Sequence, residues 1–308
     1  MPKQTVREFV TRIEKGLLDT SSGGILSTRQ QEKFIGKMVD AWSVLSKVRL
    51  INNMDSPNYE LNELDIADRQ AYKPTAGTEP TSGEILDFTI NSRTLTVEEL
   101  SLAANISKNW LMRNIEKESA EQTINNKLGI SLGGNILDLA INGDGTTSGF
   151  LAMNKGWLTL ADEDSTVNDF DTDGSQDMAG VVFPGLRDAL PEKARFTETE
   201  KPVIVCNIAD ADTYLDQIKD RKTARGDQAL IDGIAGHYEG HPIVPFPYWP
   251  KGHFFMTPLS NLVIGIWEKM ALYRQYMPRK HQLEFTLDAQ VDPNYELGWM
   301  IAYGRNTA

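Results

Sequence analysis

The sequence predicts an α+β protein, because helical and strand-like patterns occupy long separate stretches of the chain. Two amphipathic helical patterns lie in the first fifty residues, and a third spans about 110–141. Residues 59–101 hold two strand-like stretches joined by a turn-rich segment, and apolar strands close the chain. Hydrophobic residues make up 40% of the 308 positions and charged residues 24%, which excludes disordered and low-complexity classes.

The two N-terminal patterns each place apolar side chains on one face of a helix. The first stripe consists of Val6, Phe9, Val10, Ile13 and Leu17, and the second of Ile35, Met38, Val39, Trp42 and Leu45. We expect each stripe to be buried in a core or in an interface between subunits, rather than to bind a cofactor.

Residues 59–101 predict a long β-hairpin with a broad tip. The tip runs from Lys73 to Gly83 and is rich in the residues that favour turns. The flanking stretches carry only a few apolar side chains, so the hairpin has too little apolar surface for a core of its own. Because an isolated two-stranded hairpin is marginally stable in water, we expect it to lie on another surface, and another subunit is a candidate.

A long helix is predicted from about Trp110 to Ile141, where apolar residues keep roughly helical spacing. The segment Asn142-Gly143-Asp144-Gly145 is expected to end and cap it. Three glycines lie inside the pattern and predict a bend or break there, because glycine disfavours a helix interior. They are Gly129, Gly133 and Gly134.

Residues 161–177 contain seven acidic residues and no basic one, which predicts a solvated loop. Asp169, Asp171 and Asp173 match the first half of a calcium-binding loop. The twelfth position of that loop should be a bidentate glutamate and is Gly180 instead. Bound calcium is therefore a minor alternative to a plain acidic loop.

The remaining chain alternates strands and helices. A helix is predicted at about 178–190 and a strand at 203–206. A helix at 212–218 and a polar loop at 221–232 follow. Four closing strands are expected, at 262–267, 272–276, 283–287 and 299–303. The single cysteine, Cys206, lies in an apolar run and is interpreted as a small buried side chain.

Charge and motif content argue against several functions. The net charge of −12 disfavours a protein that binds nucleic acid by neutralising phosphates. No apolar run approaches the length of a membrane-spanning helix. His237 and His241 have a glutamate between them, but it is one position too late for a zinc-protease helix, and the neighbouring Gly240 and Pro242 disfavour a helix. A strand and turn is the preferred interpretation.

The order of several short motifs resembles one family. The predicted long helix ends in Asn142-Gly143-Asp144-Gly145, and Gly149-Phe150-Leu151 follows. Further on come Gly240-His241-Pro242-Ile243-Val244 and Asn261-Leu262-Val263-Ile264-Gly265-Ile266. With the preceding arm and hairpin, this order resembles the tailed-bacteriophage major capsid protein family, which has the Hong Kong 97-type fold. Each motif is weak alone, but the resemblance covers nearly the whole chain.

The resemblance implies a division of the chain into five parts. Residues 1–58 would be an N-terminal arm and residues 59–101 an extended loop. A peripheral domain would span 102–200 and contain the long "spine" helix, and an axial domain would span 201–265. Residues 266–308 would return to the peripheral domain. Subunit interfaces are then expected at Phe9, Ile13, Trp42, Lys73, Pro74, Gly77, Glu79, Arg221, Lys222 and Arg225.

The implied function is structural, with no enzymatic activity and no cofactor. Subunits would assemble into hexamers and pentamers of an icosahedral shell around double-stranded phage DNA, held by enclosure and not by sequence. The implied partners are other copies of the chain, a separate scaffolding protein and a portal, with decoration proteins as an open question. Assembly would occur in the bacterial cytoplasm and the product would be the virion capsid. Two alternatives remain: a host protein compartment shell of the encapsulin type, and a metal-dependent hydrolase.

Overall fold

The structure is a computed structural model. It describes residues 35–36, 38–39, 42–54, 56–66, 73, 79, 81, 88–107, 120–146, 149–172, 174, 177–195, 200–219 and 236–306. Helices and sheets occur together, so the predicted α+β class is confirmed. The predicted stripe at 6–17 and the polar loop at 221–232 lie outside the described residues.

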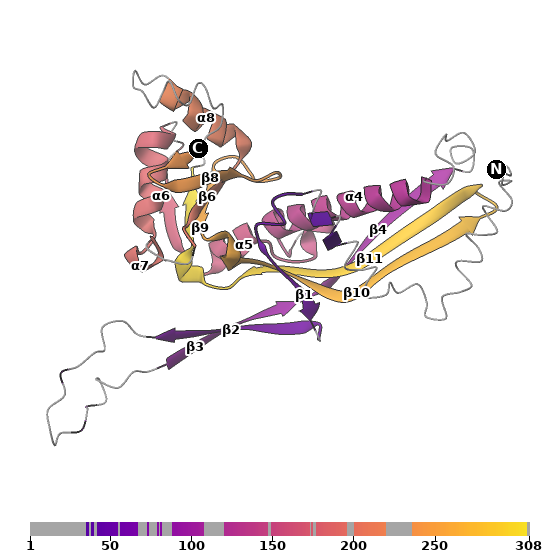
Figure 1. The fold of residues 1–308 in the computed structure, drawn as a ribbon, viewed down its shortest axis with the longest axis horizontal. Helices are drawn as coiled ribbons and strands as arrows, with labels where there is room; N and C mark the ends of the chain where they lie inside the picture. Colours follow the sequence, from indigo (N-terminus) through magenta and orange to yellow (C-terminus); the bar gives the residue numbers. More distant parts are fainter. Residues whose placement is uncertain are drawn as a thin grey trace.

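One half of the molecule is built on a long four-stranded sheet (Figure 1). Its strands are β1 (Arg49–Met54), β10 (Leu262–Met277), β11 (Gln282–Tyr295) and β4 (Glu98–Ser107), in that order. β1 is parallel to β10, and the other pairs are antiparallel. The predicted strands at 262–267 and 272–276 are one element, with an irregularity in pairing between Trp267 and Ala271.

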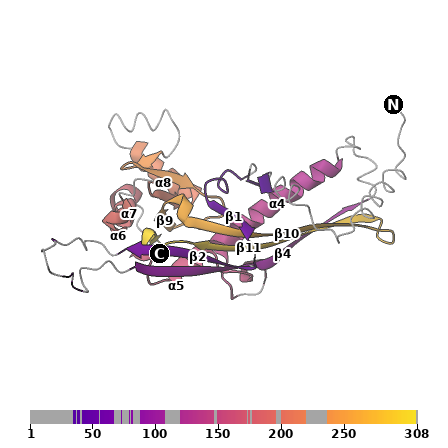
Figure 2. The same cartoon turned by 60° about the horizontal axis from the view of Figure 1, so that its bottom comes forward.

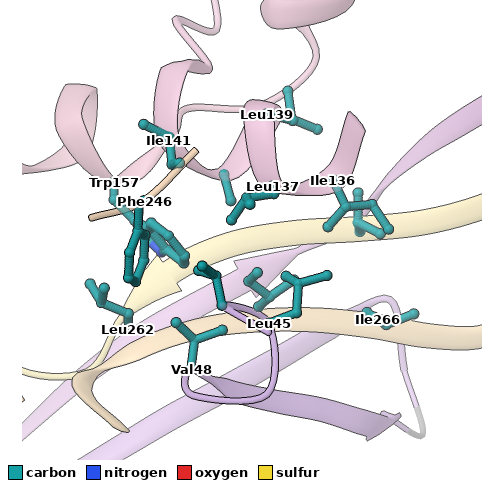
Figure 3. Packing of buried hydrophobic residues seen from close by; sticks show 14 of the residues in the cluster. Leu45, Val48, Ile136, Leu137, Leu139, Ile141, Trp157, Phe246, Leu262 and Ile266 are labelled. Atoms are coloured by element: carbon teal, nitrogen blue, oxygen red, sulfur yellow. The ribbon is translucent and has the colours of Figure 1, made fainter. Parts of the chain in front are cut away.

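The predicted long helix is α4 (Ala120–Asn142), which lies along this sheet (Figure 1). Its buried residues include Leu132, Ile136 and Leu139, which join the main apolar core together with the sheet (Figure 3). The predicted break is wrong, because α4 continues through all three glycines. Two of them instead allow close approach: a Cβ on Gly133 would lie 2.5 Å from Met38 Cγ and 2.9 Å from Trp42 Cδ1.

The other half contains a six-stranded sheet. In order, its strands are β5 (Asn168–Asp171), β12 (Ala302–Arg305), β9 (His253–Thr257), β6 (Val203–Cys206), β8 (His241–Pro245) and β7 (His237–Tyr238). Its helices include η2 (Met178–Val182), α6 (Phe183–Ala189), α7 (Glu192–Arg195) and α8 (Ile208–Lys219). Residues of η2, α6 and α8 form a second apolar core with these strands.

The six-stranded sheet is built from stretches of chain that are far apart in the sequence. Strand β5 precedes position 201 and pairs with β12 in this sheet, and residues of η2, α6 and α7 pack in one core with β6, β8 and β9. Strand β12 comes from the closing segment and lies between β5 and β9. The α/β half therefore combines three separate stretches of chain, and the predicted division into five parts stays a prediction.

The acidic stretch 161–177 is not simply a solvated loop. It holds the end of α5 (Trp157–Glu163) and the whole of β5. Arg305 on β12 supplies the missing base: its Nε lies 2.7 Å from Asp171 Oδ1, and it also pairs with Asp162 and Asp169. Because this arginine is more than 130 positions away in the sequence, the local charge count could not reveal it.

None of the described helices is long and apolar enough to cross a membrane.

Candidate assembly surfaces and the hairpin base

The predicted hairpin is confirmed as β2 (Asn58–Ile66) and β3 (Phe88–Thr96). The two strands pair in antiparallel register from Asn58–Thr96 to Ile66–Phe88 and form a sheet of their own. They project from the body near β1 and β4, as both views show (Figures 1 and 2). Lys73 and Glu79, between the strands, are exposed. The hairpin therefore extends beyond the main core (Figure 1), with two exposed charged residues described between its strands.

The base of the hairpin has a small apolar cluster that the sequence did not predict. Leu61 of β2, Leu95 of β3 and Val97 pack with Met54 of β1 and Val263 of β10, and all five are at most 9% exposed. The expectation that the hairpin lies on something else is thus met at its base by its own chain. That another subunit covers the outer part of the hairpin remains a prediction.

An arginine contact also fastens the base. On β3, Arg93 Nη2 lies 2.5 Å from Asp164 Oδ2, just after α5, and the guanidinium carbon lies 4.5 Å from the ring centre of Tyr295. Tyr295 Oη donates to the same carboxylate at 2.8 Å. Burial works to raise the pKa of Asp164, but hydrogen bonds from Thr166, Arg93 and Tyr295 outweigh it and hold the pKa at about 2.

An aspartate contact lies at the other side of the base. Asp292 on β11 accepts hydrogen bonds from the Thr96 backbone N–H, at 2.7 Å, and from Asn154 Nδ2, at 2.5 Å. Its side chain is buried, and burial raises its pKa to about 6 although both hydrogen bonds lower it. Two carboxylates of opposite character therefore hold the end of β3 on the body.

We expect Arg93→Ala to lower the free energy of unfolding by about 2 kcal/mol, because it removes a charge-assisted hydrogen bond and leaves Asp164 partly buried without its cation. Arg49→Ala is the matched control, since Arg49 also pairs with a carboxylate, that of Glu296, but is more exposed. Its cost should stay below about 1 kcal/mol. Urea denaturation of the unassembled chain measures both, and equal costs would contradict the ranking.

The segment before β1 packs on the spine helix of its own chain. Trp42 Nε1 donates to the Ile130 carbonyl oxygen at 2.8 Å, and its ring centre lies 5.8 Å from that of Tyr248. Trp42 is only partly buried by these contacts, so its prediction as an interface residue stays open. Seven other predicted interface residues lie outside the described part: Phe9, Ile13, Pro74, Gly77, Arg221, Lys222 and Arg225.

The residues considered for other chemistry occupy structural positions. His237 and His241 lie on β7 and β8 with a turn between them, as the preferred interpretation predicted, and His241 Nδ1 is 3.0 Å from the Pro202 carbonyl oxygen. Cys206 is fully buried, and burial raises the pKa of its thiol to about 12. Among the residues that the structure describes, no group of three acidic, histidine or cysteine side chains is arranged to hold a metal ion. Asp173 is outside them.

Sequence reasoning missed Arg93, Asp164, Asn154 and Asp292. Each of these residues contacts a partner that lies 71 to 196 positions away in the sequence, and no local motif marks such pairs. The one available signal is that Arg93 is the only basic residue of β3, where the flanking Ser92 and Thr94 are polar and uncharged.

The long helix over a four-stranded sheet, the projecting hairpin and the separate α/β half together define the Hong Kong 97-type fold of tailed-phage capsid proteins, as the resemblance implied. The chain is similar to YqbE of Bacillus subtilis (strain 168), which carries a provisional name as a prophage capsid protein. The two are 24% identical over 303 residues, which cover 94% of this chain and 95% of YqbE. No family model matches the sequence.

Solved capsids share the architecture over almost the full length. A satellite phage P4 procapsid that includes the size-determination protein Sid matches with a TM-score of 0.69 and 12% identity, over 98% of each chain. The capsid of an empty GTA particle matches with a TM-score of 0.62 and 17% identity, over 96% of this chain and 98% of the other. At these identities the likeness establishes the fold.

Proposed function

We propose that the chain is the major capsid protein of a tailed phage or prophage and that it assembles into the hexamers and pentamers of an icosahedral shell. The observation that carries this proposal is the hairpin, whose base is packed and bonded to its own body while Lys73 and Glu79, between its strands, are exposed. A fixed base with exposed residues between the strands suits a contact that reaches a neighbouring subunit. The P4 procapsid and GTA capsid matches support a shell role.

Ring assembly also fits the kind of contact that such a hairpin makes. Hexamers and pentamers use heterologous interfaces, in which one surface of a subunit meets a different surface of the next. The exposed Lys73 and Glu79 of the tip would belong to one such surface. The N-terminal arm would add a second contact, because its apolar stripe requires burial.

Assembly should require the hairpin tip, whereas folding of the subunit should not. We expect the full chain, expressed alone or with a scaffolding protein, to form closed shells or tubes in negative-stain electron microscopy. Replacing residues 67–87 by a short glycine-rich turn should abolish these assemblies and leave a folded subunit with an unchanged circular dichroism spectrum, because the small apolar cluster at the hairpin base is kept.

A matched control keeps the loop length and replaces Lys73 and Glu79 by serine. It should weaken assembly less than the deletion does, because exposed charges contribute little singly. A chain that stays monomeric in every condition, or a tip deletion that assembles normally, would contradict the proposal.

The further partners follow from the shell role. A separate scaffolding protein, a portal and double-stranded DNA held by enclosure are proposed, with assembly in the bacterial cytoplasm and the virion as the final location. The net charge of −12 is compatible with DNA that is enclosed without tight binding. Nuclease-protected DNA in particles from induced cells would support a phage shell, whereas particles filled with a host protein would favour a compartment shell. No enzymatic role is proposed.

A further inference from the structure

We propose that the base of the hairpin is a pH-dependent hinge, in which the end of β3 is held most firmly on β11 in mildly acidic solution and loosens towards neutral pH. The inference concerns the subunit itself and does not require that the chain forms a shell. It rests on the aspartate contact and the arginine contact, which hold the same strand by carboxylates in opposite surroundings.

The two carboxylates differ in what compensates their charge. Asp164 has a guanidinium at 2.5 Å, so its ionised form is the one that the seated hairpin stabilises. Asp292 is 9% exposed, and among the described residues it receives two N–H groups. Among the described residues no lysine or arginine forms a salt bridge with it. Burying an ionised carboxylate without a cation is unfavourable, so the seated hairpin stabilises the protonated form of Asp292.

Within the part of the chain that the structure describes, one further charge acts on Asp292. Glu98 on β4 acts on it as a like charge and raises its pKa further. The end of β3 offers the neutral backbone N–H of Thr96, and the segment after η1 (Phe150–Ala152) offers the neutral amide of Asn154. Across the sheet, its partner on β10 is Gly265. Of these four neighbours, only Thr96 and Asn154 favour the ionised form of Asp292, through their hydrogen bonds.

The direction of the pH effect follows from linkage. In the seated state the pKa of Asp292 is raised to about 6, and in an unseated state, open to water, it returns towards its ordinary value. Seating is therefore favoured below that value and loses this advantage as the pH rises through about 6. The arginine contact responds oppositely, because Asp164 must stay ionised, with a pKa of about 2. Seating then weakens again in strong acid.

The Thr96 amide reports the hinge directly, because its N–H donates to Asp292. Hydrogen exchange of the full-length chain, read at single-residue resolution and corrected for the intrinsic rate, is compared at pH 5 and pH 8 in one fixed assembly state. We expect protection at Thr96 to be about tenfold higher at pH 5. In Asp292→Asn, which keeps the shape and an acceptor oxygen, the difference should vanish.

Asp288→Asn is the matched control, since Asp288 lies on the same strand and accepts a hydrogen bond from Ser101 Oγ on β4, but is less buried. It should keep the tenfold difference. Glu98→Lys, at an exposed position, provides a second route if Asp292→Asn does not fold: it should move the midpoint of the profile to lower pH. A wild-type chain with equal protection at both pH values, an Asp292→Asn variant that keeps the difference, or an unmoved midpoint in Glu98→Lys would overturn the hinge.

Discussion

Gly143→Ala is expected to destabilise the subunit by about 3 kcal/mol or more, because the added Cβ would be forced against backbone atoms. A Cβ at Gly143 would lie 2.7 Å from the Leu139 carbonyl oxygen, 2.8 Å from the Gly156 nitrogen, and close to the Asn154 carbonyl oxygen as well. All three are backbone atoms. The end of α4 would therefore have to separate from residues 154–156, and the hydrogen bond from Gly156 N–H to the Gly143 oxygen, now 2.8 Å, would be lost.

Gly36→Ala is the control for this substitution. Gly36 is helical, and a Cβ there would meet no atom within 4 Å. Because alanine favours a helix over glycine by up to about 1 kcal/mol, this variant should be neutral or slightly stabilised. Urea denaturation at a concentration that prevents assembly measures both. A Gly143→Ala chain with the wild-type midpoint would show that the contact of α4 with residues 154–156 is not as tight as described.

Trp157→Ala is expected to cost about 3–5 kcal/mol, the usual range for removing a buried tryptophan. The side chain is 0% exposed and belongs to the main core shown in Figure 3. Its Nε1 donates to the Asn294 carbonyl oxygen at 2.8 Å, so it ties α5 to β11. Trp157→Phe should cost less, because it keeps an aromatic ring in the core, although it also loses this hydrogen bond.

The control for the tryptophan is Tyr273→Ala on β10. This ring is 44% exposed, so its removal should cost less than about 1 kcal/mol in the unassembled subunit. Unfolding can be followed by fluorescence in every variant, because the chain has six tryptophans and five remain after either change at position 157. Equal losses for the two aromatic residues would contradict the placement of Trp157 in the core.

The elements that the sequence predicts well are those defined by local periodicity. The spacing of Ile136 and Leu139 identified the helix, and the Gly143 turn identified its end. The hairpin was predictable because turn residues separate two strand-like stretches. These signals lie within a few residues of one another, so no knowledge of the tertiary fold was needed.

The features that escaped prediction depend on distant contacts. Gly133 was interpreted as a helix breaker from its propensity, whereas its lack of a side chain leaves room for Met38 and Trp42, about ninety positions earlier. The acidic stretch was interpreted without Arg305, which reaches it only because β12 pairs with β5. The hairpin base was missed for the same reason, since Arg93 and Asp164 are 71 positions apart.

The order of the four-stranded sheet also has a consequence during protein synthesis. β1 pairs with β10 and β4 with β11, so the strands that are synthesised first cannot pair until the strands that are synthesised last are available. Arg49, for example, lies opposite Val263. Such long sequence separations slow folding, and the hairpin base cannot be completed until Asp292 has left the ribosome. Truncated chains that end before Asp292 would therefore carry a hairpin whose base is incomplete.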